Sequence, residues 1–103
     1  MNVSITARKF KAHDTLKDFI NDEVSTLTKY NDDILSADVI LSYQNVKDSI
    51  KNVEIILSVP GQQLSATGKS DDFKKSVSST VEKLARQLKK LKSKKTSMRN
   101  DKN

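Results

Sequence analysis

The chain has 103 residues, which is enough for one domain with a single hydrophobic core and too few for two. It contains no cysteine, which excludes disulfide bonds and thiolate metal sites and is compatible with a reducing compartment. No apolar run approaches the roughly 20 residues that a membrane-spanning helix needs, and the N-terminus lacks the apolar segment of a secretory signal. We therefore expect a cytoplasmic protein.

The net charge of +6 is unevenly distributed along the chain. Residues 69–103 contain twelve lysines and arginines against four acidic residues, a balance of +8. Residues 1–68 contain seven against nine, a balance of −2. This polarity predicts that one side of the molecule meets a polyanionic partner, with nucleic acid as the first candidate and an anionic membrane surface as the second.

A change of hydrophobic period separates the first two elements. Residues 2–8 alternate between apolar and polar side chains, which predicts a half-buried strand. From residue 14 the apolar positions follow helical spacing, which predicts an amphipathic helix over residues 14–30. Arg8, Lys9 and Lys11 lie between the two elements, where they either contact phosphate or are simply solvated.

Three further strands are predicted at short intervals. Residues 38–43, 53–59 and 63–68 alternate in the same way, and the Pro-Gly pair at residues 60–61 is a strong turn signal. The short connections predict an antiparallel meander. Tyr43 falls on the inward side of its strand, so we expect it and the other aromatic residues in the core rather than as platforms for base stacking.

The most informative stretch of the sequence is residues 70–95. Its apolar residues are spaced 4, 4, 3, 4 and 3 apart, which predicts one buried helix face within an arc of roughly 80°. These residues are Phe73, Val77, Val81, Leu84, Leu88 and Leu91. Five cations cluster on the opposite side within an arc of roughly 100°. They are Lys75, Lys83, Arg86, Lys90 and Lys94.

The start of this helix is expected at Ser70, whose hydroxyl can cap a free backbone N–H. Asp71 and Asp72 are then in the first turn, where carboxylates suit the helix dipole. Beyond that turn Glu82 is the only acidic residue before Asn100, so intrahelical ion pairing is scarcely available. Unpaired cations on one face repel one another, and an external polyanion relieves that repulsion.

The predicted element order is β-α-β-β-β-α. Because each strand has one apolar face and each helix one apolar stripe, we expect an α+β fold in which both helices pack on one face of a four-stranded sheet. Residues 1–95 form this domain. Residues 96–103 show no apolar periodicity and are expected to be a disordered polar tail.

No arrangement of residues points to catalysis or to a cofactor. The chain has two glycines, no phosphate-binding glycine loop, no nucleophile elbow and no His, Cys and carboxylate cluster at ligand spacing. His13, the only histidine, is expected near the cap of the first helix or in solvent, and a turn and a helix start explain the aspartate pairs. We therefore expect no enzymatic activity, cofactor, metal site or small-molecule substrate.

Several stretches of the chain match one known family in the same order. Ile5-Thr6-Ala7-Arg8 is similar to the first strand of that family, and Lys83-Leu84-Ala85-Arg86-Gln87-Leu88-Lys89-Lys90 is close to its signature in the last helix. Other similar positions are Leu16, Phe19, Ile20, Leu27, Lys29, Tyr30, Gly61, Leu64, Ala66, Asp71 and Asp72. In these stretches, between about residues 2 and 95, the sequence resembles the bacterial ribosome hibernation factors. That family comprises the short hibernation-promoting factor and the ribosome-associated inhibitor of translation.

The resemblance implies a partner and a mode of action. Members of this family bind the small ribosomal subunit and its rRNA, and the intact ribosome, in the channel between head and body where messenger and transfer RNA lie. Translation is inhibited in stress or stationary phase without any chemistry, and no membrane is involved. The rRNA-contacting cations that the resemblance implies are Lys83, Arg86, Lys90 and Lys94. Further RNA-binding candidates are Lys75, Lys89, Lys29 and Arg8.

One departure from the family concerns the first helix. Family members tend to be basic at the positions that Glu23 and Thr26 hold here, so Lys29 is the remaining candidate on that helix.

Two other interpretations stay open. A double-stranded RNA-binding domain shares the order α-β-β-β-α, but it opens its last helix with basic residues, whereas Asp71 and Asp72 stand first here. A protein that binds a membrane surface or an acidic partner would place apolar residues beside the lysines. The predicted outward face carries mostly serine and threonine instead.

Overall fold

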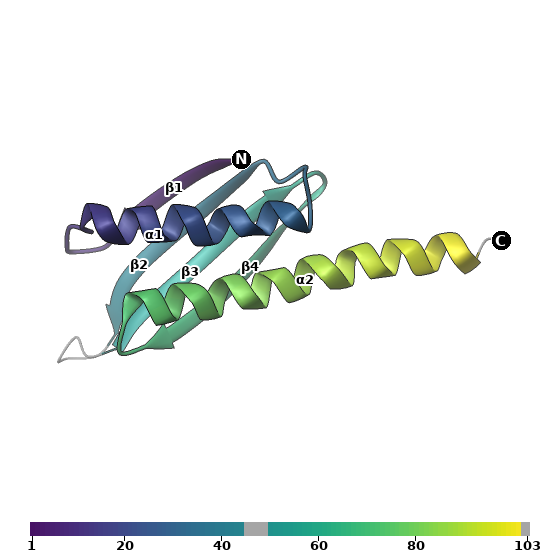
Figure 1. The fold of residues 1–103 in the computed structure, drawn as a ribbon. Coiled ribbons are helices and arrows are strands. Elements are labelled where there is room, and N and C mark those ends of the chain that lie inside the picture. The colour runs from purple at the N-terminus through teal and green to yellow at the C-terminus, as the bar shows by residue number, and fades with distance from the viewer. Residues whose placement is uncertain (45–49, 102–103) are drawn as a thin grey trace.

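The elements of the computed structural model follow the predicted order β-α-β-β-β-α (Figure 1). The structure describes residues 1–44 and 50–101, with the backbone alone for residues 92–101. The strands are β1 (Asn2–Ala7), β2 (Ser36–Gln44), β3 (Ile50–Val59) and β4 (Gln62–Ser70). The helices are α1 (Asp14–Ser25), which continues as the 3₁₀ turn η1 (Thr26–Lys29), and α2 (Phe73–Asp101).

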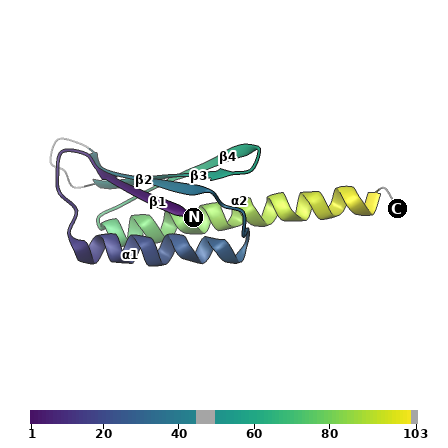
Figure 2. The same cartoon turned by 90° about the horizontal axis from the view of Figure 1, so that it is seen from above.

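The four strands form one mixed sheet in the order β1-β2-β3-β4. Strand β1 pairs in parallel with β2, while β2, β3 and β4 form the predicted antiparallel meander. A parallel pair needs a crossover connection, and α1 supplies it. Both helices lie side by side on one face of the sheet, as the view from above shows (Figure 2). The predicted α+β fold is therefore confirmed.

The core lies between the sheet and the two helices. Five of the six apolar residues predicted for the inner face of the last helix are buried, and Leu91 is half buried at the end of the row. They pack against alternate residues of the strands, such as Val39, Leu41 and Ile55, which are fully buried. The helical period of the apolar residues thus identified the packed face of α2 correctly.

Helix α2 approaches β4 closely at Gly68. A Cβ atom at this position would collide with Oγ1 of Thr80 and with the carbonyl oxygen of Ser76. Ser76 and Thr80 are fully buried, and the Ser76 hydroxyl donates to the carbonyl oxygen of Lys51 at 2.7 Å. These two hydroxyl residues of α2 therefore pack on the sheet, because only small side chains fit where helix and strand are this close.

The start of α2 corrects the sequence prediction. Strand β4 continues to Ser70, so this residue belongs to the strand and the helix begins at Phe73. Asp72 is the cap, since its Oδ1 accepts a hydrogen bond from the backbone N–H of Lys74 at 3.0 Å. Ser70 Oγ accepts instead from the backbone N–H of Asp72 at 3.1 Å and holds the connecting turn. Both aspartates thus precede the helix.

The ends of both helices also differ from the expected boundaries. The first helix was expected over residues 14–30, and its last turn, η1, is a tighter 3₁₀ turn. The backbone of α2 stays helical to Asp101, beyond residue 95 where we expected the helix to end. A functional division between a domain of residues 1–95 and a polar tail stays a prediction.

Tyr43 is more exposed than predicted. Its side chain faces the helices and contacts the rings of Phe10 and Phe73, with centroid distances of 5.0 and 5.4 Å. It nevertheless remains 38% exposed, because the pairing of β1 with β2 ends at Ala7 and Leu41, so no neighbouring strand covers this end of β2 on that side.

Candidate nucleic-acid interface

The candidate interface is the face of α2 that points away from the core. Four of the predicted cations are exposed there, and we call them the basic row: Lys75, Lys83, Arg86 and Lys90. Leu84 and Leu88, from the same turns, are only 0% and 2% exposed and lie on the opposite face. Since each helical residue advances the chain by 1.5 Å, the basic row is about 22 Å long.

The other predicted cations whose side chains the structure describes do not join the basic row. Nζ of Lys89 lies 5.2 Å from the ring centroid of Tyr30, which joins α2 to the end of the first helix by a cation–π contact. Lys29 is exposed in η1, and Arg8 is exposed in the turn after β1. The side chain of Lys94 lies outside the part of the chain that the structure describes.

Three cations of the basic row already have partners within the chain. Nη2 of Arg86 lies 2.8 Å from Oε1 of Glu82, one helical turn earlier. Nζ of Lys75 lies 3.4 Å from Oδ1 of Asp71. About two-thirds or more of each of these side chains is exposed, so solvent screens the pairs to roughly 0–1 kcal/mol each. Of these two pairs only Arg86 with Glu82 lies within the helix, because Asp71 precedes it, and this agrees with the expectation that intrahelical ion pairing is scarce.

The third partner is the free edge of β4. Lys83 Nζ donates a hydrogen bond to the carbonyl oxygen of Thr67, and Gln87 Nε2 donates to that of Ser65 at 2.8 Å. Because β4 is an edge strand, carbonyl groups on its outer side would otherwise be open to solvent or to another strand. Gln87 was not among the predicted site residues, and its role depends on the position of α2 over β4.

A shallow pocket lies beside the C-terminal end of the basic row. It has a volume of about 300 Å³ and is lined by Leu64, Gln87, Lys90 and Leu91. Leu64 and Leu91 are half buried and give it an apolar floor, while Lys90 is exposed at its rim. No pattern in the sequence predicts this pocket, because its two leucines come from β4 and α2, which are far apart along the chain.

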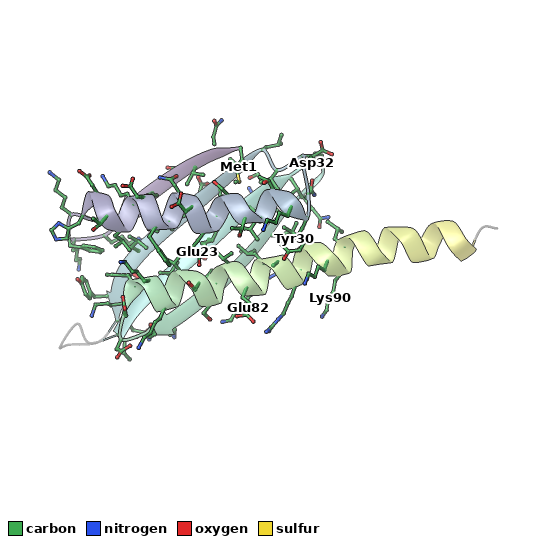
Figure 3. The ribbon with its side chains drawn as sticks, viewed as in Figure 1. Met1, Glu23, Tyr30, Asp32, Glu82 and Lys90 are labelled. Carbon is green, nitrogen blue, oxygen red and sulfur yellow. The ribbon has the colours of Figure 1, made fainter. Side chains whose placement is uncertain are left out.

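The first helix contributes more acidic side chains than cations. Glu23 accepts a hydrogen bond from Ser78 Oγ at 2.7 Å and so links α1 to α2. Figure 3 shows Glu23 and Tyr30 between the two helices and Lys90 on the side of α2 away from α1. The outer face of α1 carries three exposed aspartates one turn apart: Asp14, Asp18 and Asp22.

The residues that the structure describes contain no group of three or more His, Asp or Glu side chains placed to hold a metal ion. No helix in this part of the chain is long and apolar enough to cross a membrane.

Known proteins match the chain over most of its length. The family model described as "Sigma 54 modulation protein / S30EA ribosomal protein" matches residues 3–96. A ribosome hibernation promoting factor from Azotobacter vinelandii is 30% identical over 88 residues, which are 85% of this chain and 79% of the relative. One from Pseudomonas putida is 26% identical over 98 residues, 95% of this chain and 93% of the relative.

Two solved structures share the fold at 24% sequence identity each. A ribosomal subunit interface protein from Coxiella burnetii superimposes with a TM-score of 0.83 and covers 90% of this chain and 99% of its own. The N-terminal domain of Protein Y from Thermus thermophilus gives a TM-score of 0.79, with 88% and 99% covered. These matches confirm the resemblance noted in the sequence. Because the family model matches nearly the whole chain, the protein belongs to the family of sigma 54 modulation and S30EA ribosomal proteins, which includes the ribosome hibernation promoting factors.

Proposed function

We propose that this protein is a ribosome hibernation factor that binds the rRNA of the small ribosomal subunit. It binds both the free small subunit and the small subunit within the intact ribosome. It occupies the channel for messenger and transfer RNA and inhibits translation in the cytoplasm during stress or stationary phase. The observation that carries the proposal is the basic row, four exposed cations in a line on the face of α2 away from the core. The protein's family membership indicates that the polyanion bound by the basic row is ribosomal RNA.

The basic row can bind RNA through the phosphate backbone. Lysine ammonium groups act as point charges toward phosphate, and the arginine guanidinium can bind two phosphate oxygens at once. These contacts position the protein without reading a sequence. A domain held in this way in the channel excludes messenger and transfer RNA by its volume alone, so inhibition needs no bond to be made or broken.

A double-stranded RNA-binding domain is disfavoured by the start of α2. Such a domain uses basic residues at the start of its last helix to contact the RNA. Here Asp72 caps the helix, and Asp71 pairs with Lys75, the first cation of the basic row. The remaining three cations of the row follow two or more turns later.

The test reverses three cations of the basic row at once, as Lys83→Glu, Arg86→Glu and Lys90→Glu. Each change removes a charge-assisted contact and adds repulsion, so affinity for small subunits should fall at least about 100-fold. Inhibition of translation in vitro should disappear with it. Exposed charges contribute roughly 0–1 kcal/mol each to stability, so the urea midpoint should change little.

A matched triple variant provides the control. Lys9→Glu, Lys11→Glu and Lys17→Glu change the net charge by the same amount at the other end of the chain. This variant should still co-sediment with small subunits and intact ribosomes and should still inhibit translation. Equal inhibition by the two triple variants would show that α2 is not the RNA-facing element.

A further inference from the structure

We infer that the pocket formed by Leu64, Gln87, Lys90 and Leu91 holds one unpaired nucleobase of the bound RNA and prefers a base with an exocyclic amino group. The inference rests on the proposed function, because it specifies how the RNA held by the basic row is read. It goes beyond phosphate binding, which carries no sequence information.

The position of the pocket suits a nucleotide. Lys90 belongs both to the basic row and to the rim of the pocket, so a phosphate held by Lys90 has its base within reach of the apolar floor. Arg86 lies one helical turn before Lys90 and can hold the neighbouring phosphate. The positive charge around the opening is complementary to RNA.

The size and lining of the pocket suit a base. Small-ligand pockets range from roughly 300 to 1,000 Å³, and this one, at about 300 Å³, lies at the lower end. Leu64 and Leu91 are half buried, so they offer apolar surface that the flat face of a base can cover. Proteins that recognise specific RNA sequences bind bases that are unstacked from their neighbours, because an unstacked base exposes its hydrogen-bonding edges.

Gln87 supplies the polar group that distinguishes the bases. Its Nε2 donates to the carbonyl oxygen of Ser65 at 2.8 Å, and that carbonyl belongs to β4, which is fixed in the sheet by its pairing with β3. A carbonyl oxygen can only accept a hydrogen bond, so this contact sets the orientation of the amide. Oε1 of Gln87 is then left as a preorganised acceptor at the pocket.

An acceptor at this place favours some bases over others. Cytosine, adenine and guanine each carry an exocyclic amino group that can donate to Oε1 of Gln87. Uracil has only its imino N–H, which stands between two carbonyl groups that repel an acceptor. We therefore expect cytosine to be preferred over uracil, which has the same ring size.

The first experiment compares binding of the whole protein to oligocytidylate and oligouridylate of equal length at the same salt concentration. Oligocytidylate should bind about 3- to 10-fold more tightly, the range expected for one hydrogen bond. Gln87→Met should lower its affinity to that of oligouridylate. Gln63→Met makes the same change at an exposed position of β4 and should keep the preference. The urea midpoint of each variant checks its folding.

Several results would overturn the inference. Equal affinity of the unmodified protein for the two oligonucleotides would do so, as would binding to neither. A preference that persists in a folded Gln87→Met variant, or that disappears equally in Gln63→Met, would show that Gln87 does not read the base.

The second experiment maps the base on the ribosome. Dimethyl sulfate modifies the pairing edges of adenine and cytosine, and kethoxal modifies that of guanine, so the bound protein should protect one such base in small-subunit rRNA. The Gln87→Met variant, added at a saturating concentration, should not protect this base, whereas the Gln63→Met variant should protect it. Identical protection by both variants would overturn the pocket as a base site. If the unmodified protein does not bind small subunits at all, the proposed function fails, and the oligonucleotide comparison still decides on the pocket.

Discussion

Glu82 is the acidic residue within the surface that we propose for RNA binding. It holds Arg86 at 2.8 Å, and both side chains are about two-thirds exposed. In the free protein this pair reduces the repulsion between Arg86 and its neighbours in the basic row. In a complex with RNA, the same carboxylate would compete with phosphate for the guanidinium. Glu82 would therefore lower the affinity of the interface.

Glu82→Gln should raise the affinity for small subunits about two- to fivefold, because the exposed pair that Arg86 must leave is worth roughly 0–1 kcal/mol. The measurement is a binding titration at fixed salt. Glu54→Gln removes the same charge from β3, on the sheet face away from the helices, and should change the affinity less. If both variants bind equally well, net charge rather than Arg86 explains the gain.

At the scale of elements, α2 both completes the core and carries the basic row. Its inner face packs on the sheet, and Gly68 lets it come close to β4. Lys83 and Gln87 also fix the position of α2 relative to the sheet, because both donate hydrogen bonds to carbonyl oxygens at the edge of β4. The packing of the inner face therefore fixes the direction in which the cations point.

Leu84→Ala should destabilise the protein by about 2–5 kcal/mol, because Leu84 is fully buried and its truncation leaves a cavity. That is a large share of the free energy of unfolding of a typical domain, which is roughly 5–15 kcal/mol. Leu35→Ala makes the same change at a residue that is 59% exposed and should cost less than about 0.5 kcal/mol. Urea denaturation measures both. Equal midpoints would mean that the helix phase is wrong.

At the scale of the whole molecule, the outer faces of helices α1 and α2, which lie side by side on the sheet, carry opposite charge. The outer face of α1 presents Asp14, Asp18 and Asp22, and the outer face of α2 presents the basic row. Phosphate attracts the second surface and repels the first. The domain should therefore approach RNA with α2 foremost.

Binding to small subunits should weaken steeply as salt rises, because each phosphate contact releases counterions. With four contacts, log K should fall against log salt with a slope of about −3 to −4. Lys90→Ala should make the slope less negative by about 1, whereas Lys9→Ala should leave it unchanged. Titrations between low and physiological ionic strength measure this, and a flat response would exclude phosphate-directed binding.

The sequence by itself determined the order of the elements, the buried face of α2 and the outward direction of the four cations. These features depend on periodicity within one segment, so residues a few positions apart are sufficient to reveal them. The similarity to the family also lies in the sequence, at positions spread over nearly the whole chain.

Only the tertiary structure decided which residues from different elements meet. The parallel pairing of β1 with β2, the bond from Ser78 to Glu23 and the pocket between Leu64 and Leu91 all join segments far apart in the chain. The close approach at Gly68 likewise buries the hydroxyl residues Ser76 and Thr80 between helix and strand. Such contacts depend on which strand lies at the edge and how closely the helix crosses it, and no local period encodes either.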